Sequence, residues 1–127
     1  MKVQLKDLTL EQFEDIIVNA MELGSNYWYL VNPIEFRVSL QGKEGDPLST
    51  RIAQTLYNDK TFFIGVYDLE DPSYLLGTLT QESLLKALEI AYTRYTSHYT
   101  NFISGNGDAE TSDVIFQLAV MGELVFG

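Results

Sequence analysis

The sequence has 127 residues, no cysteine, and a formal net charge of −10 from 18 acidic and 8 basic residues. This length suits one domain with a self-sufficient core, and the missing cysteines exclude disulfides, thiolate metal ligands and cysteine nucleophiles. Because phosphates and anionic lipids repel such an acidic chain, direct binding to nucleic acid or to a membrane is not expected.

The chain begins with M-K-V-Q-L-K-D, which lacks the apolar stretch of a signal peptide, so we expect a cytoplasmic protein. Val3 and Leu5 alternate with polar residues, which predicts a short strand. A helix follows Thr9, whose side chain can form a capping box with Gln12, and Gly24 ends that helix. One face of the helix is acidic and carries Glu11, Glu14, Asp15 and Glu22.

Two strands are predicted next. Residues 27–31, Y-W-Y-L-V, are aromatic and β-branched. Residues 34–40 alternate between apolar and polar, which is typical of a half-buried strand. Asn32-Pro33 separates the two segments, and the glycine-containing stretch 41–47 predicts a loop after them.

A short helix is expected at 48–57, and it is followed by strands at 62–67 and 75–79. The turn between these strands, residues 68–74, contains the dipeptide D-P and adds a second group of acidic residues. The carboxylates of this turn are Asp68, Glu70 and Asp71.

The longest helix is predicted from Gln81 to about Ile103, with Thr80 as its cap. Its apolar stripe is aliphatic first and aromatic later. The aromatic part consists of Tyr92, Tyr95 and Tyr99. Tyrosines at this spacing suit either the edge of a core or the seam of a homodimer.

The last segment, residues 105–127, predicts a helix buried in the core, because free terminal segments are usually polar. Asp108 or Thr111 caps this helix, and its buried face includes Leu118 and Gly122. The complete pattern predicts a single α+β domain over residues 1–127. We expect a mixed, mostly antiparallel sheet, two long helices on one face of it, and a buried C-terminal helix.

Two stretches carry a family resemblance: M-E-L-G-S-N-Y-W at 21–28 and D-A-E-T-S-D-V-I-F-Q-L-A-V-M-G-E-L-V-F-G at 108–127. They resemble a group of small acidic proteins that phages, plasmids and other mobile elements encode. Those proteins carry an approximate G-x-N-Y-W motif and close with D-A-x-x-x-D-V-x-x-Q-x-x-x-x-G-E-x-x-x-G. The resemblance implies a mobile-element setting in a host cytoplasm, and no particular reaction.

Oxygen ligands are concentrated in one short stretch, at Asn106, Asp108, Glu110 and Asp113. A calcium loop of the EF-hand type requires Gly at its sixth position and Glu at its twelfth, and these are Thr111 and Gln117 here. Capping of the last helix explains the acidic residues better. The single histidine, His98, is expected at the surface. No metal or cofactor is predicted.

Three polar residues interrupt the terminal apolar segment: Asp113, Gln117 and Glu123. A buried carboxylate can be a catalytic group. It can also be a structural acceptor that ties the last helix to the turn Asn26-Tyr27-Trp28, and this structural interpretation is favoured. Trp28 is expected in the core, although Asn26 and Trp28 together could line a small pocket.

The acidic face of the first helix is the remaining candidate site. A solvated helix face is the commoner explanation of such a charge run. However, the chain has no basic residue between Lys6 and Arg37 and none after Arg94. Together with the net charge and the resemblance, this favours a DNA mimic that occupies a basic groove on another protein.

Three functions follow. The favoured one is inhibition of a nucleic-acid-handling defence protein, of the anti-restriction or anti-CRISPR kind, with a basic nucleic-acid-binding host protein as partner. The second is binding of a small ligand near Asn26 and Trp28. The third is a hydrolase that uses the carboxylates of Asp108 and Asp113. The predicted binding residues are Glu11, Glu14, Asp15, Glu22, Asn26, Trp28, Asp68, Glu70 and Asp71.

Overall fold

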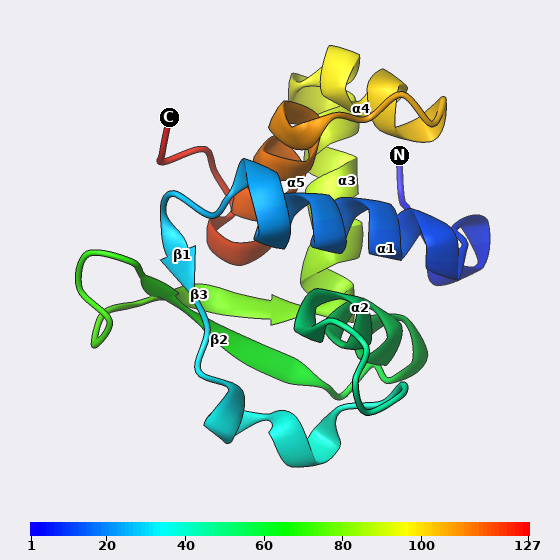
Figure 1. The fold of residues 1–127 in the computed structure, drawn as a ribbon. Helices are drawn as coiled ribbons and strands as arrows, with labels where there is room; N and C mark the ends of the chain where they lie inside the picture. Colours follow the sequence, from blue (N-terminus) through cyan, green and yellow to red (C-terminus); the bar gives the residue numbers. More distant parts are fainter.

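The computed structural model describes all 127 residues and confirms the α+β class (Figure 1). The helices are α1 (Leu10–Asn19), α2 (Leu48–Asn58), α3 (Gln81–Arg94), α4 (Thr96–Ile103) and α5 (Ala109–Met121). The strands are β1 (Tyr29–Leu30), β2 (Phe63–Asp68) and β3 (Leu75–Thr80). Short 3-10 turns lie at Leu5–Asp7, Pro33–Glu35 and Arg37–Ser39, and a π-helical turn at Ala20–Gly24 extends α1. No helix has both the length and the apolar character that crossing a membrane requires.

The sheet is antiparallel throughout, with β2 between β1 and β3. Ile64 and Val66 of β2, together with Leu79 of β3, point into the core and are fully buried. The register shifts between Val66 and Tyr67, so β2 carries a bulge near the hairpin. Figure 1 shows α1, α3 and α5 on one side of the sheet, and the segment 33–39 on the other side.

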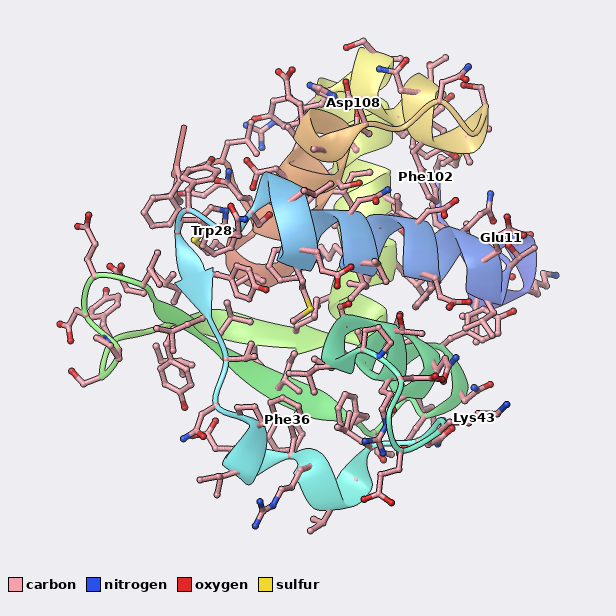
Figure 2. All side chains as sticks on the ribbon, in the orientation of Figure 1. Glu11, Trp28, Phe36, Lys43, Phe102 and Asp108 are labelled. Carbon is pink, nitrogen blue, oxygen red and sulfur yellow. The ribbon has the colours of Figure 1, made fainter.

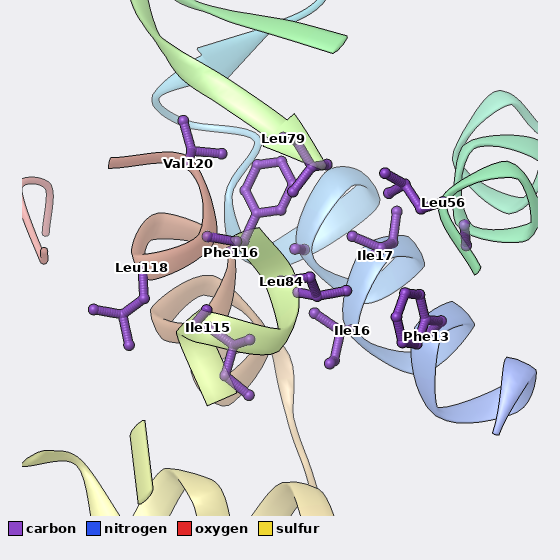
Figure 3. Close-up of a cluster of buried hydrophobic side chains, with 14 of the residues drawn as sticks. Phe13, Ile16, Ile17, Leu56, Leu79, Leu84, Ile115, Phe116, Leu118 and Val120 are labelled. Carbon is purple, nitrogen blue, oxygen red and sulfur yellow. The ribbon is translucent and has the colours of Figure 1, made fainter. Parts of the chain in front are cut away.

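The predicted buried C-terminal helix is confirmed, because all ten residues from Thr111 to Val120 are buried. α5 packs against α1, α3, α4, β3 and the π-helical turn. Figure 3 shows Ile115 and Phe116 of α5 among the aliphatic side chains of the other elements. A helix that is buried on every side is mostly apolar, and its buried polar side chains need hydrogen-bond partners; in α5 the residues from Val114 to Val120 are apolar except for Gln117.

Two glycines allow the closest approaches to α5. A Cβ on Gly24 would overlap the carbonyl oxygen of Ala109 at the start of α5. A Cβ on Gly77 of β3 would overlap the carbonyl oxygen of Val120 near its end. Both neighbours are backbone atoms that cannot rotate away, so these two positions require glycine for steric reasons.

Two predicted strands are wrong. Residues 3–5 lead into the 3-10 turn Leu5–Asp7, and residues 34–40 form the two 3-10 turns at Pro33–Glu35 and Arg37–Ser39. The side chain of Asn32 accepts a hydrogen bond from the backbone N–H of Ile34, and Pro33 fixes φ at the first position of the turn. These local interactions favour a turn over an extended strand.

The long helix predicted for 81–103 is divided at Tyr95, whose φ of −135° and ψ of 55° are not helical. The hydroxyls of Thr93 and Thr96 donate to the carbonyls of Glu89 and Tyr92, one turn back along the helix. Such bonds bend helices slightly, and here they accompany the break.

Smaller differences concern strand length and the ends of α5. The predicted strand 27–31 is paired only at Tyr29–Leu30. Asp108, and not Thr111, caps α5. Gly122 is exposed and ends α5 in the left-handed conformation with a φ of 78°, so it does not belong to the buried face.

Leu118→Asp tests the burial of α5, because Leu118 is only 3% exposed. A carboxylate at this position would have no partner, so the variant should lose several kcal/mol, on the order of 3–5, in free energy of unfolding. Thermal unfolding followed by circular dichroism measures the effect. Leu124→Asp is the control, because Leu124 is exposed and the same change there should have little effect.

Candidate functional site

The acidic residues of α1 are held outward by the apolar face of the same helix. Phe13, Ile16 and Ile17 are buried, and the capping box of Thr9 and Gln12 fixes where the helix begins. Glu11, Asp15 and Glu22 are exposed, and Glu14 is half-buried. Although the Asp15 side chain is exposed, partial desolvation of its carboxyl and the nearby Glu11 carboxylate raise the pKa of Asp15 above its usual value.

The start of α5 adds two further exposed carboxylates, Asp108 and Glu110. The Asp108 carboxylate accepts a hydrogen bond of 2.8 Å from the backbone N–H of Thr111. This bond is the main reason why the pKa of Asp108 lies below its usual value. Asp108 is therefore ionised at neutral pH while it caps the helix.

α1 and the start of α5 lie side by side. Asp15 and Asn19 share a small hollow of about 20 Å³ with Gly107 and Thr111. We call the set of carboxylates on α1, on the π-helical turn that extends it and at the start of α5 the acidic face: Glu11, Glu14, Asp15, Glu22, Asp108 and Glu110. The fold thus brings together the two parts of the chain, residues 7–36 and 95–127, that contain no lysine or arginine.

A buried carboxylate, Asp113, connects α5 to the turn that follows the π-helical turn. Asp113 on α5 is only 9% exposed and accepts four hydrogen bonds. The donors are Ser25 Oγ at 2.7 Å, Trp28 Nε1 at 2.8 Å, Tyr27 OH at 2.8 Å and Gln117 Nε2 at 3.1 Å. The interpretation of Asp113 as a structural acceptor that ties α5 to the turn is confirmed. Ser25 was missed, because a serine after a glycine resembles an ordinary turn residue.

Gln117 connects the C-terminal segment to this network. Its Oε1 accepts hydrogen bonds from the backbone N–H groups of Val125 and Phe126, both at 2.9 Å. The Phe126 ring stacks on Trp28 with 5.2 Å between the ring centres. Glu123, the third polar residue of the segment, is exposed. Val125 and Phe126 are therefore fixed to the core by the Gln117 amide and by the stacking of Phe126 on Trp28.

Asn26 and Trp28 do not form a hollow. Trp28 is 2% exposed, and it lines none of the four hollows of the surface. Asn26 is exposed, and its amide donates to the carbonyl of Glu22 at 3.4 Å. A ligand could reach Trp28 only by displacing packed side chains such as Phe126.

The acidic turn between β2 and β3 lies far from the start of α1, at the opposite end of the molecule in Figures 1 and 2. Asp68 accepts a hydrogen bond from the backbone N–H of Glu70, and Asp71 accepts one from the hydroxyl of Ser73. Two of the three predicted carboxylates in this turn therefore stabilise the turn itself.

The proposed pair of catalytic carboxylates does not converge. Asp108 is exposed and bound to the first turn of α5, whereas Asp113 is buried against the turn at residues 25–28. No three acidic or histidine side chains gather in a way that could hold a metal ion. His98, expected at the surface, is half-buried, and its Nδ1 lies 2.9 Å from the hydroxyl of Thr111.

Comparisons with protein-family models, with curated proteins and with solved structures find no match.

Asp113→Asn should destabilise the fold by about 3 kcal/mol, because the amide would place a donor among four donors. Urea unfolding followed by Trp28 fluorescence measures the loss. Glu110→Gln, an exposed change on the same helix, should cost less than about 1 kcal/mol. Equal stability of Asp113→Asn and wild type would contradict the structural role of the carboxylate.

Tyr27 should make the stability pH-dependent at alkaline pH. The Tyr27 side chain is 47% exposed, but desolvation of its hydroxyl and the hydrogen bond to Asp113 raise its pKa from 10 to about 12. Because the folded pKa is above the unfolded one, the contribution of Tyr27 is complete below pH 10 and is lost as the pH rises towards about 12. Urea unfolding across this range should show a steeper fall for wild type than for Tyr27→Phe. The Tyr29 pKa, also raised to about 12, affects both proteins equally.

Proposed function

We propose that this chain is an acidic interaction protein that inhibits a nucleic-acid-handling defence protein of its host. In this proposal the acidic face occupies the basic groove in which the partner binds nucleic acid, as in anti-restriction and anti-CRISPR inhibitors that mimic DNA. The mobile-element setting rests on the sequence resemblance. The observation that carries the proposal is the packing of α1 against the start of α5, which joins the two base-free parts of the chain.

The arrangement of the charges supports this proposal. Glu11 and Asp15 lie one helical turn apart, so their carboxylates are spaced by on the order of 6 Å along the face. Like charges at this spacing destabilise a helix slightly. A cationic groove on a partner would remove this repulsion, and the same charges would accelerate the encounter of the two proteins.

Rigidity is a second supporting feature. α1 is fixed by its capping box, and the start of α5 is fixed by the Asp108 cap and by the bonds to Asp113. Carboxylates on ordered helices can match a fixed set of cations without a large loss of conformational entropy on binding. A solvated charge run on a mobile segment would not offer this advantage.

The first experiment captures partners from host lysate at low and high salt and identifies them by mass spectrometry. Recovery of a basic nucleic-acid-binding protein that is lost at high salt is expected, because exposed charges are screened within about 8–10 Å. The purified partner should then lose its bound DNA when the acidic protein is added. A partner whose DNA binding does not change would contradict mimicry.

Neutralising α1 tests where the partner binds. The variant Glu11→Gln, Glu14→Gln, Asp15→Asn and Glu22→Gln should weaken binding by about 100-fold, which corresponds to about 2.7 kcal/mol. The matched control neutralises four exposed acidic residues elsewhere, Glu44, Asp46, Glu82 and Glu123. Glu11 in the first variant and Glu82 in the control each lie in the first turn of a helix, so both variants lose one favourable charge at a helix N-terminus. Equal affinities of the two variants would refute this location.

A further inference from the structure

The segment after α5, residues 123–127, is held on the core by few contacts. It lies outside every helix and strand, and Phe126 is half-buried while the other four residues are exposed. None of the five residues takes part in a backbone–backbone hydrogen bond. All three hydrogen bonds that connect the segment to the rest of the chain are made by the side chain of Gln117. Because segments with so few buried contacts open more easily than the core, this one can open without breaking a helix or the sheet.

The surface beneath this segment is built by other elements. Trp28 donates from Nε1 to the Asp113 carboxylate at 2.8 Å, and its ring contacts Phe116 with 5.6 Å between the ring centres. The Nε2 of Gln117 donates to the same carboxylate at 3.1 Å. None of these contacts involves the segment, so we expect the surface to keep its shape when the segment leaves.

The amide of Gln117 is oriented to bind a peptide backbone. A carboxylate oxygen accepts hydrogen bonds and cannot donate them, so the Nε2 side of the amide must face Asp113. Its Oε1 is thereby directed at the segment, where it accepts from the N–H groups of Val125 and Phe126, both at 2.9 Å. Nε2 also donates to the carbonyl of Phe126 at 3.2 Å. These are backbone groups, so another peptide of the same conformation would present them equally well.

The side chains of the segment define what else fits. The Phe126 ring stacks on Trp28 with 12° between the two ring planes. The position that follows has little room, because a Cβ on Gly127 would lie 2.9 Å from the hydroxyl oxygen of Tyr27. The φ of 92° at Gly127 also favours glycine. The surface therefore fits an aromatic residue that is followed by glycine.

We propose that Trp28, Gln117 and Tyr27 form a peptide-binding site, and that residues 123–127 fill it as a displaceable internal ligand. When the segment turns away at Gly122, the site takes an aromatic–glycine segment of a partner protein. That partner is a different protein, because two copies of a chain with a net charge of −10 repel each other. The proposal does not depend on the proposed function, since none of these residues belongs to the acidic face.

Hydrogen exchange of the wild-type chain, followed by NMR, tests whether the segment opens on its own. The amides of Val125 and Phe126 should exchange at least about 100-fold faster than the amide of Leu118, which exchanges only when α5 opens. Equal exchange rates of the three amides would overturn the proposal, because the segment would then open only together with the core.

A blocked peptide with the sequence of residues 122–127, G-E-L-V-F-G, tests binding. Phe126→Ala in the full chain empties the aromatic part of the site, and the fluorescence of Trp28, the only tryptophan, reports binding. This variant should bind the peptide at least about 10-fold more tightly than wild type, in which Phe126 competes for the site. Leu124→Ala, an exposed change in the same segment, should bind the peptide as weakly as wild type.

Two altered peptides show whether the expected contacts are made. Replacing the phenylalanine of the peptide by alanine, or methylating the two backbone nitrogens that correspond to Val125 and Phe126, should each weaken binding to the Phe126→Ala variant at least about 10-fold. No binding of the unaltered peptide at about 1 mM would overturn the proposal. Equal binding of all three peptides would overturn it too, as would equal affinities of wild type and Phe126→Ala. A wild type that dimerises by exchanging this segment would assign the site to a second copy instead of a partner protein.

Discussion

The buried carboxylate of Asp113 is the interaction on which the rest of the structure depends. Two donors bind each of its oxygens: Ser25 and Trp28 on Oδ1, Tyr27 and Gln117 on Oδ2. These donors replace the water that an ionised carboxylate loses on burial. Trp28 is also a core side chain, so its ring cannot move without breaking a charge-assisted hydrogen bond. The hydrogen bonds of Asp113 and the packing of Trp28 thus both require the same position of α5.

The steric constraints act in the same direction as the hydrogen bonds. Gly24 and Gly77 let the backbone approach the two ends of α5, at Ala109 and Val120. A methyl group on either glycine would prevent the backbone from coming this close to α5. The network around Asp113 lies between them and resists sliding of the helix along its axis. Because α5 contacts most other elements, fixing it also fixes the distance between α1 and the start of α5, where the acidic face lies.

The sequence predicts well those features that neighbouring residues determine. The caps at Thr9, Thr80 and Asp108 were identifiable because each cap bonds a residue three positions away. The same holds for the acidic stripe on α1, which follows from helical spacing alone. The contacts of Asp113 could be anticipated only in part. Its bond to Ser25 spans 88 positions, and no local pattern indicates that a turn serine donates to a helix so distant in sequence.

The failure at residues 34–40 has a different cause. Alternation of apolar and polar residues predicts a strand only if the apolar side chains are buried, and here Phe36 is buried while Ile34 and Val38 are exposed. In this segment the alternation of apolar and polar residues does not mark a buried face, because two of its apolar side chains are exposed. Charge along a helix can be read from sequence, whereas exposed apolar residues become visible only when the fold shows that the core does not contain them.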